Sequence, residues 1–175
     1  MTEPIDGLTR PGGRDLDGEE LLAVANQIAA RPDLWSAHVR HDPTQRTFRE
    51  LLRDEHLDVW LLCWSNDHDT GFHDHDLSAG AVAVVAGSVR EERLLLGRSP
   101  QAPLARTAGA GDSFQFGASD IHRVLHAGGE PAVTIHAYSP PLVRMGSYTI
   151  EPDGQLHRHV VSHEEELRQL DAASS

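Results

Sequence analysis

Residues 71–96 read GFHDHDLSAGAVAVVAGSVREERLLL, and this stretch decides the fold. It predicts three short strands, at Gly71–His75, Ala81–Val85 and Ser88–Leu96, because segments of Val, Ala and Leu alternate with Gly, Asp and Ser and no helical pattern intervenes. The same alternation of short apolar segments with turn residues continues before and after this stretch. It predicts further strands at Thr47–Leu52, Val59–Trp64, Ala105–Ala108, Asp112–Phe116, His122–His126, Ala132–Tyr138 and Met145–Ile150. About ten short strands with no helix between them are typical of a mainly β protein, an antiparallel sandwich or barrel.

Helices are expected only outside this β-rich region. Asp17 can cap a helix that begins at Glu19–Glu20 and runs to Ile28 with apolar residues at helical spacing, and a second short helix is plausible over 33–39. Ser162 and Glu165 resemble a capping box, which predicts a closing C-terminal helix over 162–170. We expect a flexible tail at residues 1–15 and a single domain over residues 16–175.

The composition excludes several classes of function. The 175-residue chain carries 27 acidic against 15 basic residues, a formal charge of −12, which disfavours nucleic acids and anionic membranes. All the basic residues are Arg, so a Schiff-base or P-loop lysine is excluded. The single cysteine, Cys63, cannot form an intramolecular disulfide, and the longest apolar run, 79–87, is too short to cross a bilayer. We therefore expect a soluble cytoplasmic protein.

The 12 histidines are the most unusual feature of the composition. His73 and His75 lie two apart in an extended segment, so both imidazoles face the same side, about 7 Å apart along the strand. That geometry suits two positions on one metal ion, although a His-x-His pair also arises by coincidence in a chain so rich in histidine. His122, on a distant strand, can supply a third ligand, because inward-facing residues of different strands converge inside a barrel.

A second row of polar side chains lies on the strand near residue 135. Thr134, His136 and Tyr138 alternate along it and therefore share one face, where they can form a hydrogen-bonded row among apolar neighbours. Another His-x-His pair, His157 and His159, has no strand context and is interpreted as two surface histidines.

Three separated motifs together resemble the cysteine dioxygenases, thiol dioxygenases of the cupin superfamily. They are Gly71–His75, the segment from Gly111 through Ile121-His122-Arg123-Val124, and Pro131–Pro141, and the resemblance covers roughly residues 46–142. It implies a small antiparallel β-barrel that holds one Fe(II) ion on three histidines. By motif position these ligands are His73, His75 and His122.

The match also has one departure from the wider superfamily. Most cupins carry a Glu a few residues after the His-x-His pair, and here that place is Gly80. Some vertebrate cysteine dioxygenases carry a Cys there, crosslinked to the tyrosine that matches Tyr138. With Gly80 no such crosslink can form, so the resemblance implies a neutral three-histidine site and a free phenol at Tyr138. It also makes Ser139–Pro140 a candidate cis bond.

The resemblance further implies roles for the remaining candidates. Thr134, His136 and Tyr138 match the family's catalytic Ser-His-Tyr row, and the family's arginine that pairs with the substrate carboxylate is matched by Arg49, with Arg144 as a second candidate. Trp64 and Phe72 are expected to wall the substrate site. Together with the metal ligands His73, His75 and His122, these are the functional residues that the sequence predicts.

The implied reaction adds both atoms of O2 to a small-molecule thiol and gives a sulfinic acid, with cysteine as the leading substrate. The alternatives are another thiol, such as 3-mercaptopropionate, another mercapto acid, cysteamine or ergothioneine. A non-catalytic metal- or ligand-binding cupin and a cupin with other chemistry, such as ring cleavage or isomerisation, also stay open. A monomer or a homodimer fits the sequence equally well.

Overall fold

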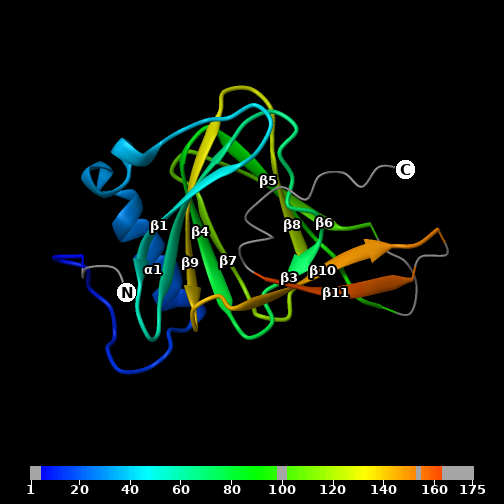
Figure 1. Cartoon of the computed structure of the whole chain (residues 1–175), viewed down its shortest axis with the longest axis horizontal. Coiled ribbons are helices and arrows are strands. Elements are labelled where there is room, and N and C mark those ends of the chain that lie inside the picture. The colour runs from blue at the N-terminus through cyan, green and yellow to red at the C-terminus, as the bar shows by residue number, and fades with distance from the viewer. Residues whose placement is uncertain (1–4, 98–101, 153–154, 163–175) are drawn as a thin grey trace.

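Two antiparallel sheets form the protein in the computed structural model, which describes residues 5–97, 102–152 and 155–162. The first sheet has the order β1–β2–β9–β4–β7, with β1 at Thr47–Arg53, β2 at Asp58–Trp64, β4 at Ala79–Ala86, β7 at Ser113–Phe116 and β9 at Ala132–Ser139. The second has the order β11–β10–β3–β8–β5–β6, with β3 at His73–Asp74, β5 at Ser88–Arg93, β6 at Leu104–Gly109, β8 at His122–His126, β10 at Arg144–Ile150 and β11 at Leu156–Ser162. Helix α1, Gly18–Ala29, covers the side of the first sheet that faces away from the second (Figure 1).

The ten predicted strands are all present, with ends shifted by a few residues. The segment Gly71–His75 shortens to the two-residue β3, and β5 ends at Arg93 rather than Leu96. Strand β11 was not predicted: it holds His157 and His159 and pairs with β10 over its whole length. Most of its residues are exposed, so it lacks the apolar alternation that marks a buried strand.

The helices differ in part from the prediction. Asp17 caps α1 as expected, and its side chain accepts from the Glu20 backbone while the Glu20 carboxylate accepts from the Asp17 backbone. The second short helix, expected over residues 33–39, is present as two consecutive 3-10 helices, Pro32–Leu34 and Ser36–His38. Of the predicted C-terminal helix, Ser162 ends β11 and the other residues lie outside the described part of the chain.

The N-terminal segment contacts the rest of the protein. Ile5 and Leu8 pack against the apolar cluster under α1, and Thr9 exchanges hydrogen bonds of 2.9 Å with the Gln27 side chain. Ile5, Leu8 and Thr9, which lie in the segment expected to be a tail, therefore contact the rest of the protein.

Alternation along the strands of the first sheet creates two separate apolar clusters. On β2, Val59 and Leu61 join the cluster between the sheet and α1, whereas Trp60, Leu62 and Trp64 face the space between the sheets. Both sets are almost fully buried, which explains why the sequence of β2 is continuously apolar. The inner face of this sheet and the inner face of the second sheet enclose the candidate site.

Pairing registers fix which polar side chains enter that space. On the first sheet, β9 lies between β2 and β4, and its Thr134, His136 and Tyr138 share the inner face with Leu62 and Val82. On the second sheet, His73 of β3 lies directly opposite His122 of β8. The row on β9 and the histidines therefore meet across the sandwich. No helix among the described residues is long and apolar enough to cross a membrane.

Candidate metal centre

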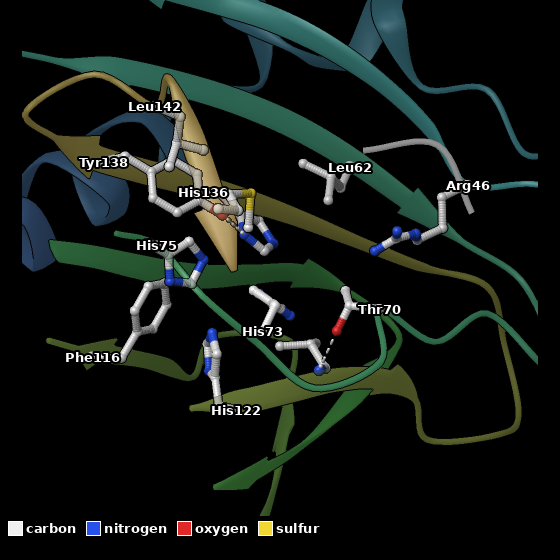
Figure 2. Close-up of a pocket in the computed structure, with 12 residues that line it drawn as sticks. Arg46, Leu62, Thr70, His73, His75, Phe116, His122, His136, Tyr138 and Leu142 are labelled. Atoms are coloured by element: carbon white, nitrogen blue, oxygen red, sulfur yellow. Dashed lines mark hydrogen bonds between the residues drawn. The ribbon is translucent and has the colours of Figure 1, made fainter. Parts of the chain in front are cut away.

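Three buried histidines converge between the sheets. His73 and His122 come from paired strands, and His75 follows β3 one residue later, held by a 3.3 Å hydrogen bond from its backbone N–H to the Ala118 carbonyl. Their ring centroids lie 4.8–5.1 Å apart, and one candidate ligand nitrogen from each lies within 4.8 Å of the others (Figure 2). The three predicted ligands are thus brought together on one wall of a cavity.

The hydrogen bonds of these rings indicate which nitrogens are left for a metal. His73 Nδ1 lies 3.0 Å from the Gly71 carbonyl, and His122 Nδ1 lies 2.8 Å from a carboxylate oxygen of Glu91. Both Nδ1 atoms must donate, because carbonyls and carboxylates only accept, so each Nε2 carries a lone pair. Within the described residues, His122 Nε2 and both ring nitrogens of His75 are buried without a hydrogen-bond partner. Buried polar atoms need partners, and a divalent metal ion between these rings would supply one.

The electrostatics of the site keep these rings neutral. Burial lowers the pKa of His73 to about 4, and burial, followed by the neighbouring histidines, lowers the pKa of His75 well below its ordinary value. Burial and the adjacent His73 do the same to the pKa of His122. Since a histidine binds metal through an unprotonated nitrogen, the three-histidine cluster fits a cation at neutral pH.

The space that a side chain at Gly80 would occupy is filled by the ring of Phe116. A Cβ at Gly80 would lie 2.4 Å from two ring atoms of Phe116 and 3.0 Å from Cδ1 of Tyr138. Phe116 in turn stacks on His75 with ring centroids 4.6 Å apart and contacts His122 at 4.3 Å. Gly80 is therefore required by the Phe116 ring, which packs against two of the three histidines.

The polar row on β9 is continuous and includes Trp64. The indole Nε1 of Trp64 donates to Thr134 Oγ1 at 2.8 Å, Thr134 Oγ1 lies 2.9 Å from His136 Nε2, and His136 Nδ1 lies 3.0 Å from the Tyr138 hydroxyl. Within the described part of the chain, the Thr134 hydroxyl contacts no acceptor other than His136 Nε2. Because Trp Nε1 can only donate, we infer that Thr134 donates onward to His136 Nε2.

This direction sets the tautomer of His136. Burial, followed by the nearby Arg46, lowers the pKa of His136 to about 3, so the ring is neutral and carries one proton. With Nε2 accepting, that proton is on Nδ1 and is donated to the Tyr138 oxygen. Tyr138 therefore donates its own hydroxyl hydrogen away from the row, and it lines the cavity beside the three histidines (Figure 2).

The other predicted site residues lie elsewhere. Arg49 is exposed on the outer face of β1 and lines a separate pocket with Arg40 and Cys63. It pairs with Leu61, an outward residue of β2, so alternation turns it away from the histidines. The guanidinium carbon of Arg123 lies over the Phe72 ring, 5.1 Å from its centroid. Alternation along the chain directs the Phe72 side chain away from that of His73.

Arg144 lies outside the cavity as well. It is exposed, its guanidinium donates to Asp76 at 2.8 and 3.1 Å, and it lines a surface groove together with His75 and Pro140. The Ser139–Pro140 bond that leads into this loop is cis, as expected from the sequence.

The sequence analysis missed the arginine that does line the cavity. Arg46, just before β1, is 4% exposed, and its guanidinium carbon lies 5.2 Å from the centroid of the Trp64 ring. It lines the cavity with the three histidines, Thr70 and Tyr138 (Figure 2). The sequence carries no signal that separates it from Arg49, because Phe48, two residues after Arg46, is seen to pack against the inner cluster only in the structure. Residues two apart on a strand share a face.

Asp74, between two of the ligand histidines, is part of the scaffold. Its carboxylate accepts two hydrogen bonds from Arg158 at 2.7 and 2.8 Å and one from the Tyr148 hydroxyl at 2.6 Å. Burial alone would raise the pKa of Asp74, but these hydrogen bonds outweigh it and lower the pKa. Asp74 thereby ties β3 to β10 and β11.

The second His-x-His pair is not near this centre. His157 and His159 are exposed on β11, and within the residues described the cluster of His73, His75 and His122 is the only group of three or more metal-ligating side chains.

Comparisons with known proteins identify a family. The family model described as "Cysteine dioxygenase type I" matches residues 12–150, more than half of the chain. Cysteine dioxygenase type 1 of Bos taurus is 24% identical over 139 residues, which is 74% of this chain and 68% of that protein. The protein of the same name from Danio rerio is 27% identical over 134 residues, which is 70% of this chain and 65% of that protein.

Solved structures show the same fold. A protein with a double-stranded β-helix domain from Klebsiella pneumoniae superposes with a TM-score of 0.51 at 16% identity, over 60% of this chain and 80% of that one. A cupin superfamily protein from Desulfitobacterium hafniense gives a TM-score of 0.50 at 9% identity, over 61% and 87%. The two-sheet architecture is therefore a cupin fold.

Proposed function

The chain belongs to the cysteine dioxygenase type I family, and from this membership we propose that it is an Fe(II)-dependent dioxygenase that converts a small thiol carrying a carboxylate, with cysteine as the leading candidate, to a sulfinic acid. The observation that carries the proposal is the cavity itself. Three neutral histidines form one wall, Tyr138 stands beside them, and a buried arginine lies at the same cavity.

His73, His75 and His122 would hold the metal. Fe(II) bound there would supply the centre at which the sulfur of a thiolate and O2 are brought together. Neutral imidazole suits iron, and a histidine set without a carboxylate leaves the full positive charge of the ion to favour thiolate over thiol.

The protein side chains would orient and protect the reactants. The hydrogen-bonded row from Trp64 to Tyr138 holds the phenol in one orientation, so that its hydroxyl can donate a hydrogen bond to a group at the metal. Leu62, Leu142 and Phe116 line the same cavity with apolar surface and keep water from it.

Arg46 takes the place that the sequence analysis gave to Arg49. It is buried at the cavity, whereas Arg49 is exposed on the opposite face of the sheet. A planar guanidinium pairs with a carboxylate through two parallel hydrogen bonds, and stacking near Trp64 restricts its orientation. We therefore assign Arg46 as the partner of the substrate carboxylate.

A second substrate is favoured by the same lining. The described residues around the cavity include no Asp or Glu that could pair with an ammonium group. A mercapto acid without an amine, such as 3-mercaptopropionate, would leave no unpaired charge there. Cysteine and 3-mercaptopropionate are therefore both tested, and cysteamine, which lacks a carboxylate, serves as the contrast.

The test compares Arg46→Gln with Arg49→Gln in iron-loaded protein. Loss of a charged hydrogen-bonding partner costs about 1.5–3 kcal/mol, so Arg46→Gln should raise KM for the carboxylated thiols by roughly 10- to 150-fold. Arg49→Gln removes the same charge from the outer face and should leave KM near that of the parent. Equal effects of the two substitutions, or an unchanged KM in Arg46→Gln, would contradict the assignment.

A further inference from the structure

Glu91 is a buried carboxylate aimed at one candidate metal ligand. It lies on β5, is 3% exposed, and accepts a hydrogen bond from His122 Nδ1 at 2.8 Å. Its face of β5 is the inner one, because Val89, two residues earlier, belongs to the apolar cluster between the sheets.

Two arginines hold this carboxylate in place. Arg106, on the neighbouring strand β6, donates from Nε to Glu91 Oε2 at 2.5 Å, and its guanidinium carbon lies 4.2 Å from the centroid of the Phe114 ring. Arg93 donates to Glu91 Oε1 at 3.3 Å. The carboxylate is thus paired and immobilised, with Oε1 directed at His122.

The three candidate ligands differ in what their Nδ1 atoms contact. His73 Nδ1 donates to a neutral backbone carbonyl, and His75 Nδ1 is buried without a partner among the described residues. The Nδ1 of His122, in contrast, donates to a carboxylate. A carboxylate that accepts from a metal-bound histidine fixes its tautomer and makes its other nitrogen a stronger donor.

We propose that Glu91 is a positioning residue that fixes the ring of His122 with Nε2 toward the metal and strengthens His122 as a metal ligand. The proposal rests on the proposed metal site. The Glu91 carboxylate, itself paired with Arg106 and Arg93, would lie one imidazole away from the ion. Glu91 does not touch the reactants, so its effect is on metal affinity.

Metal affinity is measured with Co(II) alone, by competition against a chelating dye and by the visible spectrum of the bound ion. Glu91→Gln keeps the size of the side chain and removes its charge. It should weaken Co(II) binding by about 10- to 100-fold. Glu91→Asp, which keeps the charge, should recover part of that loss.

Glu92→Gln is the matched control. Glu92 is the next residue of the same strand, and its side chain accepts from Arg90 at 2.8 Å and Arg123 at 2.9 Å rather than from a histidine. Co(II) binding should match that of the parent. An unchanged affinity in Glu91→Gln, or an equal loss in Glu92→Gln, would overturn the proposal.

A measurement on the unsubstituted protein does not depend on whether a variant folds. Nitrogen-15 NMR of the histidine rings in the metal-free protein should show His122 with its proton on Nδ1. A proton on Nε2 instead would overturn the proposal. Neither readout needs thiol oxidation, so a protein that binds Co(II) as described but oxidises no thiol would contradict the proposed function and leave the role of Glu91 standing.

Discussion

Acid should strongly destabilise the metal-free protein. Burial lowers the pKa of His136 to about 3 and that of His73 to about 4, and it lowers the pKa of His75 and His122 well below 6.5. Each folded-state pKa lies below the unfolded value, so below pH 6.5 the unfolded chain binds more protons. The contribution of these neutral histidines to the free energy of unfolding is therefore complete above pH 6.5 and is lost as the pH falls.

The magnitude follows from the linkage relation. Between pH 7.5 and pH 5.0, each histidine that stays neutral in the folded state lowers the free energy of unfolding by about 2 kcal/mol. The four together lower it by roughly 8 kcal/mol. Ordinary carboxylates titrate below this window and contribute little. A typical domain has only about 5–15 kcal/mol of stability, so most of it should disappear at pH 5.0.

Urea unfolding of chelator-treated protein at the two pH values measures this loss. His136→Gln removes one titrating ring and should reduce the loss by about 2 kcal/mol, with His159→Gln, on the exposed strand β11, as the matched substitution. A free energy of unfolding that differs by less than 1 kcal/mol between the two pH values would refute the reasoning, because the rings would then not be held neutral by burial.

Two further predictions concern the walls of the cavity. Gly80→Ala should lower the free energy of unfolding by about 1–3 kcal/mol, because its Cβ would overlap the Phe116 ring; Gly12→Ala, where a Cβ meets no atom within 4 Å, is the control, and equal urea midpoints for the two variants would be inconsistent with this packing. Tyr138→Phe should keep the bound iron, measured by metal analysis, and lower kcat on the order of 10²-fold, because the hydrogen bond that the phenol donates to a group at the metal is lost. Tyr148→Phe, whose hydroxyl instead contacts Asp74, should keep the parent kcat, and equal rates for both variants would rule out the role of Tyr138.

The histidine cluster could be predicted from strand alternation and from the order of the motifs. His73 and His75 share a face in any extended segment, and the pairing of β3 with β8 brings His122 opposite His73. The row from Thr134 to Tyr138 follows from the same rule, and the structure confirms that its members are hydrogen-bonded to one another.

Which arginine lines the cavity depends on which face of β1 turns inward. The sequence does not determine that face. Thr47–Arg53 has no clear apolar alternation, so Arg46 and Arg49 could not be separated until β1 was paired with β2. In that register Phe48 lies opposite the inward-facing Leu62, which turns Arg46 inward and Arg49 outward.

Glu91 was missed for a different reason. A Glu between two arginines in Arg90-Glu91-Glu92-Arg93 is typical of a solvated strand, and its burial is visible only once Arg106 of β6 and His122 of β8 lie beside it. Strand β11 shows the same limit, since an exposed strand that is held by its neighbour β10 carries no periodic signal.

The most direct test of the proposed activity follows the oxygen atoms themselves. Iron-loaded protein is incubated with 18O2 and either cysteine or 3-mercaptopropionate, and the mass of the product is measured by mass spectrometry. The proposed function predicts a sulfinic acid that carries two labelled oxygen atoms from one of these thiols. Recovery of unchanged thiol or of disulfide alone, from protein shown to contain iron, would contradict it.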